Sequence, residues 1–374
     1  MIQEAEIGDW LRRQPFYRGD RKDDPQVRTI KKLPLLTGHH YFVDTAHAGA
    51  YQIFLNQDGT DMSDVVSEAL ARNRVKRIPF TEGAELHGYL PDRYTLERVD
   101  YPTNPNLNFR MTDVATGEHC LLRIFHYLPE GINDEVELLS QLSGPHFPSL
   151  LGHVTIDLDG QTYTLSAVES FNLGEKGSEI AQLNSSAGFY EHNDLIKLGE
   201  TVRYMHDALA MAFPTDSLPK HYMGDHLWEL FNILLVDHPH LEEYRSRIAA
   251  LIDDMPDEFP VQRIHGNLRL DVTLYDEGRW VIIDFEESVP YPGAAELRSP
   301  TDDIGGIVGS LRAHGADNPM WCENVVRSFL EGYGQDKITP TFKACMAHRG
   351  LVMLAEATND AERLQGRRML SLEA

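Results

Sequence analysis

The chain contains 374 residues, enough for two or three domains with a sizeable core, and its apolar fraction of 42% is ordinary for a globular protein. Against 34 lysines and arginines stand 58 aspartates and glutamates, so the formal net charge is −24. This balance argues against a nucleic-acid binder or a protein of anionic membrane surfaces, because both need a basic surface to attract phosphate.

The three cysteines, Cys120, Cys322 and Cys345, form no CxxC pair, so the sequence offers neither a zinc ribbon nor a disulfide framework. The acidic N-terminal segment lacks the apolar region of a signal peptide, and no apolar stretch is long enough to span a membrane. We therefore expect a cytoplasmic protein.

The N-terminal part of the chain is predicted to form a small β-rich unit. A basic and aromatic island covers residues 8–22, and we expect its Trp10–Tyr17 stretch to pack inside that unit, with contact to a partner as the alternative. Strand-like runs follow, separated by Gly, Asp and Asn turns, and apolar residues at helical spacing then indicate a helix. The runs are Lys32–Leu36, His40–Thr45 and Tyr51–Leu55, and the helix covers residues 62–77.

An α+β unit is predicted next. Residues 94–128 have the pattern of further strands, and the short apolar run His119–Phe125 is typical of a central strand. Asn133 is placed to cap a helix whose apolar residues recur at helical spacing. The Asp159-Gly160 pair predicts a tight turn between two strands.

Helical patterns dominate from about residue 190, with one interruption. A polar loop leads into a strand at Val272–Tyr275, a turn at Asp276–Gly278 and a strand at Trp280–Ile283, and Asp284 follows directly. A hairpin of this kind in a helical lobe is typical of phosphoryl transfer, in which the loop presents a base to the acceptor hydroxyl and the acidic residue binds Mg²⁺.

A second feature points to the same chemistry. Arg123 lies on the predicted central strand and Glu135 on the helix that follows. In kinases a strand cation holds the nucleotide phosphates and pairs with a helix glutamate. Glu135 could equally be a solvated helix charge.

Five segments together resemble the actinobacterial maltokinases, relatives of the aminoglycoside phosphotransferases within the protein-kinase-like fold. Residues 265–274 are similar to the family's loop H-G-D-Y-H-L-G-Q-V-L, residues 283–289 to L-D-F-E-G-E-P, and residues 299–310 to S-P-L-R-D-V-A-G-M-L-R-S. Residues 205–215 resemble the helix M-H-R-A-L-A-x-A-F-x-T, and residues 10–19 the cap segment W-L-x-x-Q-R-W-Y-x-G-K. The segments occur in the family's order and extend over nearly the whole chain.

The resemblance implies an α+β, protein-kinase-like (aminoglycoside phosphotransferase-like) bilobal fold with an N-terminal β-rich cap subdomain. The expected division is a cap over residues 1–88, a kinase N-lobe over 89–175 and a mostly helical C-lobe over 176–374. It implies ATP and Mg²⁺ as cofactors and the reaction of ATP with maltose to give maltose 1-phosphate. It also implies a sugar ligand, and trehalose synthase or another protein of α-glucan metabolism as a partner.

The chain departs from the family at several positions where chemistry is expected. The catalytic-loop Asp, the base of the family, is Asn267, and an amide cannot accept the sugar proton. The second His is Arg269, and the metal-binding Gln is Val272, which cannot coordinate a hard cation. The strand Lys is Arg123, and the sugar-binding Glu falls at Ser288.

Other family positions are retained. They are Glu135, His265, Gly266, Asp284 and Asp303, and the resemblance assigns Asp284 to the metal and Glu135 to the strand cation. Without the resemblance, Asp284 could simply begin a turn after a strand.

Two further kinds of residue are candidate metal ligands. Asp271 could supply a compensating carboxylate beside the lost metal ligand, although a surface turn is the simpler interpretation. The histidines outside the loop have no Cys or acidic partner at ligand spacing, so we expect His39, His40, His47, His238 and His240 on the surface.

Two hypotheses follow. In the first, the protein is a maltokinase-like pseudokinase with a binding or regulatory role, because the base, one metal ligand and the strand Lys are all replaced. In the second, it is an active ATP-dependent sugar kinase with a rearranged site, because phosphoryl transfer depends mainly on positioning and electrostatics.

Overall fold

A computed structural model describes residues 3–19, 22–66, 83–99, 106–285, 297–335, 339–357 and 360–371. Contacts group the chain into two compact units, Met1–Ser140 with Pro148–Phe171, and Gln141–Phe147 with Asn172–Ala374. The finer division of the first unit at residue 88 into a cap and an N-lobe stays a prediction. No helix in these ranges is long and apolar enough to cross a membrane.

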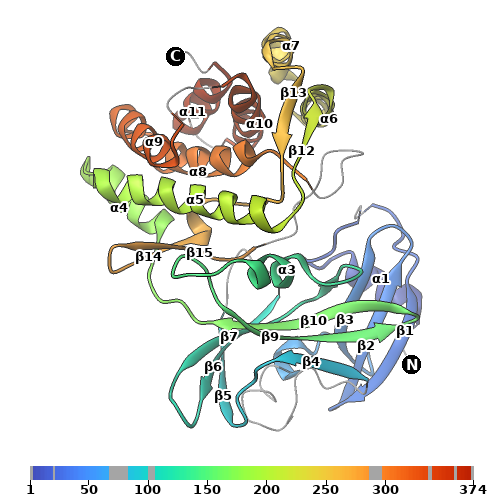
Figure 1. Ribbon diagram of the computed structural model, residues 1–374. Helices are drawn as coiled ribbons and strands as arrows, with labels where there is room; N and C mark the ends of the chain where they lie inside the picture. Colours follow the sequence, from blue (N-terminus) through green and yellow to red (C-terminus); the bar gives the residue numbers. More distant parts are fainter. Residues whose placement is uncertain are drawn as a thin grey trace. The chain divides into compact units, whose positions relative to one another are not determined.

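The first unit contains two antiparallel sheets (Figure 1). A four-stranded sheet has the order β1-β2-β3-β8, and a six-stranded sheet has the order β4-β9-β10-β7-β6-β5. The elements are α1 (Glu4–Leu11), β1 (Arg28–Leu35), β2 (Gly38–Thr45), β3 (Gly49–Asn56), β4 (Ala84–Gly88), β5 (Tyr94–Arg98), β6 (Leu107–Asp113), β7 (His119–Ile124), β8 (Tyr127–Leu128), α3 (Asp134–Gln141), β9 (Leu150–Leu158) and β10 (Gln161–Ser170).

The local predictions in this unit hold where they depend on turn or capping chemistry. The turn between β9 and β10 places Asp159 at φ 51° and Gly160 at φ 84°, the left-handed pair that a two-residue hairpin requires. Asn133 Oδ1 accepts a hydrogen bond from the Glu135 N–H at 3.0 Å, so the predicted cap of α3 is confirmed. The predicted helix over residues 62–77 is helical at 63–66, and its remainder lies outside the described residues.

The aromatic island packs inside the first unit, as predicted. Trp10, Phe16 and Tyr17 are all buried in one apolar cluster with Tyr41 and Tyr51. These large rings together fill the space between α1 and the first sheet, where their burial supplies much of the local stability.

The prediction of surface histidines is wrong for His40. Only 2% of this residue is exposed, and its Nε2 lies 3.2 Å from Gln52 Oε1. Since β2 is covered on both faces, His40 packs against Phe42 and Phe54, and burial lowers the pKa of its imidazole to about 3. The other four histidines are exposed or half-exposed; they are His39, His47, His238 and His240.

The second unit is mainly helical, with two small sheets of order β11-β14-β15 and β12-β13. Its strands are β11 (Glu175–Lys176), β12 (Asp216–Pro219), β13 (Glu258–Val261), β14 (Thr273–Asp276) and β15 (Arg279–Ile282). Its helices are α4 (Gly177–Ala187), α5 (His192–Ala212), α6 (His221–Asp237), η1 (Pro239–Tyr244), α7 (Arg245–Asp254), η2 (Leu270–Val272), α8 (Pro300–His314), α9 (Pro319–Tyr333), α10 (Pro340–Glu356) and α11 (Asp360–Ser371).

The predicted hairpin interrupts this helical unit where the sequence indicated. Strands β14 and β15 pair antiparallel from Thr273–Ile282 to Asp276–Arg279. Glu277 and Gly278 form the turn with φ values of 47° and 84°. The strand therefore ends two residues before Asp284, which places that carboxylate at the exit of the hairpin.

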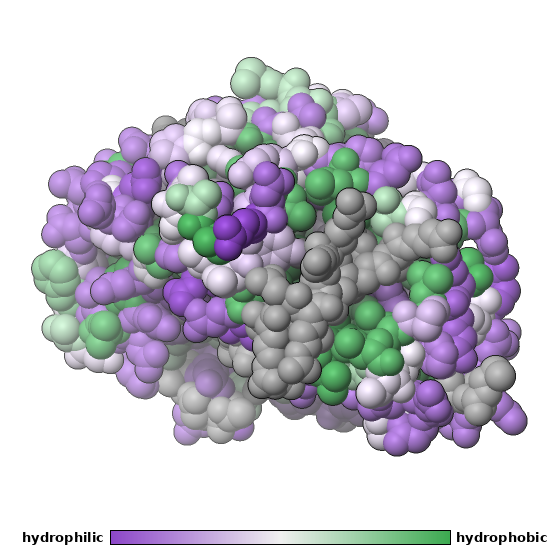
Figure 2. All heavy atoms as spheres, turned by 90° about the horizontal axis from the view of Figure 1, so that it is seen from below, coloured by the Kyte–Doolittle hydropathy of each residue, from purple (hydrophilic) through white to green (hydrophobic). Residues whose placement is uncertain are grey.

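The outer surface seen in Figure 2 is mainly hydrophilic. Smaller hydrophobic areas lie between the hydrophilic side chains. Single exposed apolar residues of this kind are normal on a folded protein.

Candidate functional site

The polar loop before the hairpin is held by its own histidine. His265 is fully buried, and its Nε2 lies 3.0 Å from the carbonyl oxygen of Ile283. The backbone N–H of Asn267 donates to His265 Nδ1 at 3.3 Å, so the ring proton belongs on Nε2, which donates to Ile283. One imidazole thus ties the loop to the residue that precedes Asp284.

A buried carboxylate holds the start of the same loop. Asp303, on α8, accepts hydrogen bonds from the backbone N–H groups of His265 at 2.8 Å and Gly266 at 3.1 Å. It also lies 3.0 Å from His206 Nε2. Although burial opposes ionisation, the hydrogen bond and charge of His206 and the hydrogen bond from the backbone N–H of His265 keep the pKa of the Asp303 carboxyl below its usual value. A charged carboxylate that accepts three hydrogen bonds holds the backbone of the loop in place.

Helix α8 touches the loop at a glycine. A Cβ atom on Gly306 would lie 1.9 Å from the carbonyl oxygen of Leu268, far inside van der Waals contact. The helix backbone therefore approaches the loop at a distance that only glycine allows.

Asn267 occupies the position that the resemblance gives to the catalytic base. Its Oδ1 lies 3.4 Å from Arg269 Nη1, and Arg269 Nε lies 3.9 Å from Asp271 Oδ2. The Asp271 side chain is 45% exposed, which agrees with a surface turn. The amide, guanidinium and carboxylate form a short polar chain along the loop.

The positions that the resemblance gives to the metal are Asp284 and Val272. Asp284 is buried and has φ 65°, a left-handed conformation that is uncommon for a residue with a Cβ and that Asp tolerates better than most. Val272 is 3% exposed, and its carbonyl accepts the N–H of Ile283 at 3.0 Å, so its backbone belongs to the hairpin and its side chain offers no oxygen. In the part of the chain that the structure describes, no group of three His, Cys, Asp or Glu side chains could hold a metal ion. Of the two positions that the resemblance gives to the metal, Asp284 keeps a carboxylate and Val272 has no oxygen in its side chain.

The strand cation lies in the first unit and has two acidic neighbours. Arg123 Nη1 lies 3.0 Å from Glu135 Oε1 on α3, and Nη2 lies 3.6 Å from Glu169 Oε1 on β10. All three side chains are at most 5% exposed, so the interpretation of Glu135 as a solvated charge is wrong. Two buried carboxylates therefore contact one guanidinium.

A cavity of about 370 Å³ lies beside the loop in the second unit. Asn267 and Arg269 form one wall, and small residues of α8 leave room beside them. The small residues are Gly306, Gly309, Ser310 and Ala313. The volume falls within the range of small-molecule sites.

The predicted site residues that the structure describes form two groups, one in each unit. Arg123 and Glu135 lie in the first unit. His265, Asn267, Arg269, Val272 and Asp284 lie along one loop and hairpin of the second unit. Ser288, the predicted sugar position, lies outside the described residues.

Sequence reasoning missed two residues of these groups. Glu169 is brought to Arg123 by the pairing of β10 with β7, which sequence alone does not give. His206 lies in the segment 205–215 that carried the resemblance, and its position in that motif was the available signal.

Comparison with known proteins bears on the whole chain. A family profile described as APH, the phosphotransferase enzyme family, matches residues 104–345. A structure described as glucosamine kinase (crystal form A) is 17% identical, with a TM-score of 0.64 over 99% of this chain and 97% of that chain. Another, described as glucosamine kinase in complex with glucosamine, ADP and inorganic phosphate, is 16% identical, with a TM-score of 0.65 over 100% of both chains. This likeness confirms the predicted fold class, a sheet-rich N-terminal part followed by a helical C-terminal part.

Proposed function

This chain belongs to the phosphotransferase enzyme family, and from that premise we propose that it is a maltokinase-related protein with severely impaired phosphoryl transfer. Its role is binding or regulation, with a sugar or nucleotide as ligand and a protein of α-glucan metabolism, such as trehalose synthase, as partner. The observation that carries this proposal is the contrast within one loop between an intact framework and altered reactive positions.

The framework of the loop is intact. His265, Gly266 and Asp303 make the hydrogen bonds that set its backbone, and Asp284 follows at the end of the hairpin. A framework of this kind suits a ligand site even where transfer is lost, since binding also needs a rigid backbone.

The substitutions at the reactive positions remove a general base and a metal ligand. Asn267 has no basic lone pair for the acceptor proton, and general base catalysis contributes about 10²–10⁴ in rate. Val272 leaves Asp284 without the second oxygen ligand of the family. Losing charge neutralisation on the transferring phosphoryl damages the larger electrostatic contribution as well.

The nucleotide side supports the same proposal. Arg123 stands in for the family's Lys and lies between Glu135 and Glu169, so a phosphate would compete with two carboxylates for one guanidinium. We therefore expect weak ATP binding that hardly depends on Mg²⁺.

Titration calorimetry with ATP, with and without Mg²⁺, tests this proposal. The expected result is a dissociation constant well above the micromolar range that changes less than about threefold with Mg²⁺. The variant Val272→Gln should increase the Mg²⁺ dependence, whereas the matched variant Val281→Gln on the neighbouring strand restores no ligand and should not. Micromolar binding by the wild type that requires Mg²⁺ would contradict the proposal.

The second candidate is an active sugar kinase with a rearranged site. The Arg269–Asp271 pair beside Asn267 favours it, because the pair places a guanidinium and a half-exposed carboxylate on the loop. In that case Asp271 supplies a carboxylate in place of the lost metal ligand. The wild type should then show measurable turnover, and Asp271→Asn should abolish it.

A further inference from the structure

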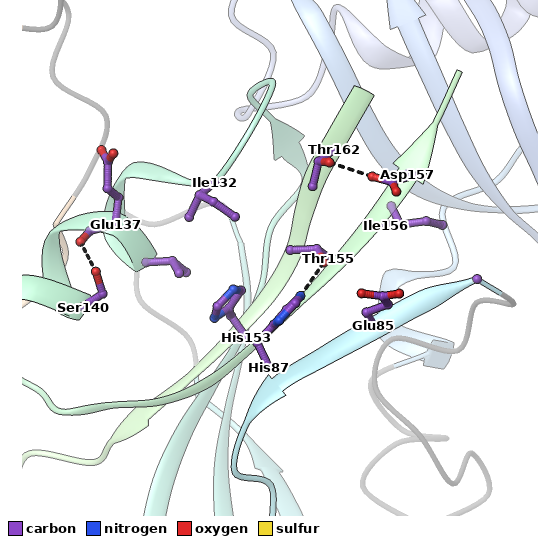
Figure 3. A pocket seen from close by; sticks show the side chains of 12 residues that line it. Glu85, His87, Ile132, Glu137, Ser140, His153, Thr155, Ile156, Asp157 and Thr162 are labelled. Atoms are coloured by element: carbon purple, nitrogen blue, oxygen red, sulfur yellow. Dashed lines mark hydrogen bonds between the residues drawn. The ribbon is translucent and has the colours of Figure 1, made fainter. Parts of the chain in front are cut away.

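A cavity of about 530 Å³ in the first unit is lined by described residues that do not include those assigned above (Figure 3). Strands β4, β9 and β10 form its floor, and α3 with the residues before it forms the opposite wall. The volume would hold a mono- or disaccharide or a molecule of similar size.

The pairing of the strands explains how this floor is built. On β4, His87 pairs with His153 of β9, and Glu85 pairs with Thr155 of the same strand. On β10, Ala167 pairs with His153 of β9 on one side and with Arg123 of β7 on the other. Residues in register across a sheet share a face, so the two histidines lie in the same row as Arg123. At about 4.8 Å per strand, His153 lies about 10 Å from Arg123 across the sheet.

The two histidines form a flat surface in the cavity. Their ring centroids are 4.7 Å apart with an interplanar angle of 18°, and His87 Nε2 lies 2.9 Å from Thr155 Oγ1. Burial, and next the neighbouring His87, lower the pKa of His153. His153 is therefore neutral at pH 7 and offers a lone pair or a ring face to a ligand.

The charges of the lining select the ligand. Glu85, Glu137 and Asp157 contribute three carboxylates to the lining, and Lys31 lies at its edge, with Nζ 3.8 Å from where a Cβ on Gly83 would be. Asp157 Oδ1 accepts a hydrogen bond from Thr162 Oγ1 at 2.6 Å, which orients that carboxylate on the floor. The excess of carboxylates over the ammonium group of Lys31 favours a cationic ligand over a phosphate or a carboxylic acid.

We propose that this cavity binds a small polar molecule carrying a protonated aliphatic amine. The ammonium group lies among the carboxylates of Glu85 and Asp157 and beside the histidine pair, where a neutral imidazole nitrogen accepts a hydrogen bond from it. Hydroxyl or further amine groups of the ligand bond to the threonines of the floor. This inference does not depend on whether the chain transfers phosphoryl groups.

Occupancy of the cavity would act on α3. Val136 and Glu137 line the cavity, and the residue before them, Glu135, contacts Arg123 at 3.0 Å. A ligand that joins Glu137 to the sheet thereby holds α3 in the position that keeps the Arg123–Glu135 pair.

The experiment is titration calorimetry at pH 7 and physiological salt with two amines, spermidine and glucosamine, and with the uncharged N-acetylglucosamine for comparison. We expect saturable one-site binding of at least one amine and none of N-acetylglucosamine. The double variant Glu85→Gln/Asp157→Asn should weaken amine binding about tenfold, equivalent to about 1.4 kcal/mol.

The matched control is Asp92→Asn/Glu118→Gln, which removes the same charge from exposed positions outside the cavity lining. This control should change the amine affinity less than about twofold. Equal losses in both double variants would mean general attraction to an acidic protein and would overturn the proposal. The absence of any amine binding tighter than about 1 mM would overturn it as well. Neither outcome bears on ATP binding, which is titrated separately.

Discussion

Replacing Asp303 with Asn tests whether one carboxylate holds the loop. The side chain is 1% exposed and accepts three hydrogen bonds, two on Oδ2 and one on Oδ1. An amide of the same shape can keep its oxygen toward His265 and His206, but its NH₂ group then faces the N–H of Gly266. One charge-assisted hydrogen bond is lost and two are weakened.

The expected cost follows from these contacts. A hydrogen bond to a charged group contributes about 1.5–3 kcal/mol, so the substitution should lower the free energy of unfolding by about 3 kcal/mol. For a unit of this size that loss corresponds to a decrease in Tm of about 6–12 °C. Differential scanning calorimetry and urea unfolding at pH 7 measure both quantities.

The control is Asp276→Asn in the β14–β15 hairpin. Its carboxylate pairs with Arg279 at 3.2 Å and is 35% exposed, so we expect a loss below about 1 kcal/mol. If Asp303→Asn cost no more than this control, the loop would not depend on the buried carboxylate, and the argument for a rigid framework would be wrong.

Three further predictions concern packing, acid stability and partner binding. Gly306→Ala should displace the loop and lower the unfolding free energy by at least about 2 kcal/mol, because its Cβ would meet Leu268 O at 1.9 Å; an unchanged Tm would contradict this. The pKa of His40 lies near 3 when folded against 6.5 in the unfolded chain. Stability should therefore be unaffected above pH 6.5 and fall by about 1.4 kcal/mol per pH unit below it, through uptake of one proton on unfolding. His40→Gln should reduce the slope of unfolding free energy between pH 6 and 4 by that amount, and equal slopes would refute the assignment. Asp284→Ala should keep every protein association seen on co-purification of the wild type; loss of all of them in a folded variant would refute a binding role that is independent of transfer.

Features set by neighbouring residues could be predicted from the sequence. The Asp159-Gly160 and Glu277-Gly278 turns follow from the left-handed backbone that these residues tolerate. Asn133 caps α3 through its own side chain, two residues from the N–H it accepts. These interactions are local, so no knowledge of the fold is needed.

Features set by strand pairing and helix packing could not be predicted in the same way. Glu169 reaches Arg123, and His87 faces His153, only because of the register of the six-stranded sheet. His40 is buried because a second layer covers β2, which its surrounding sequence does not reveal. The first strand likewise begins at Arg28 rather than at Lys32, since its polar residues conceal the pairing with β2.

The central claim is that the reactive positions of the loop no longer support efficient transfer. Formation of maltose 1-phosphate from ATP and maltose by the wild type, by Asn267→Asp and by Asn267→Asp/Val272→Gln measures this directly. We predict a turnover far below about 1 s⁻¹ for the wild type, the lower limit of ordinary kinases. Little recovery is expected with the single repair and more with the double repair, because residues that act as one unit are not additive. A wild-type turnover of about 1 s⁻¹ or above would contradict the account.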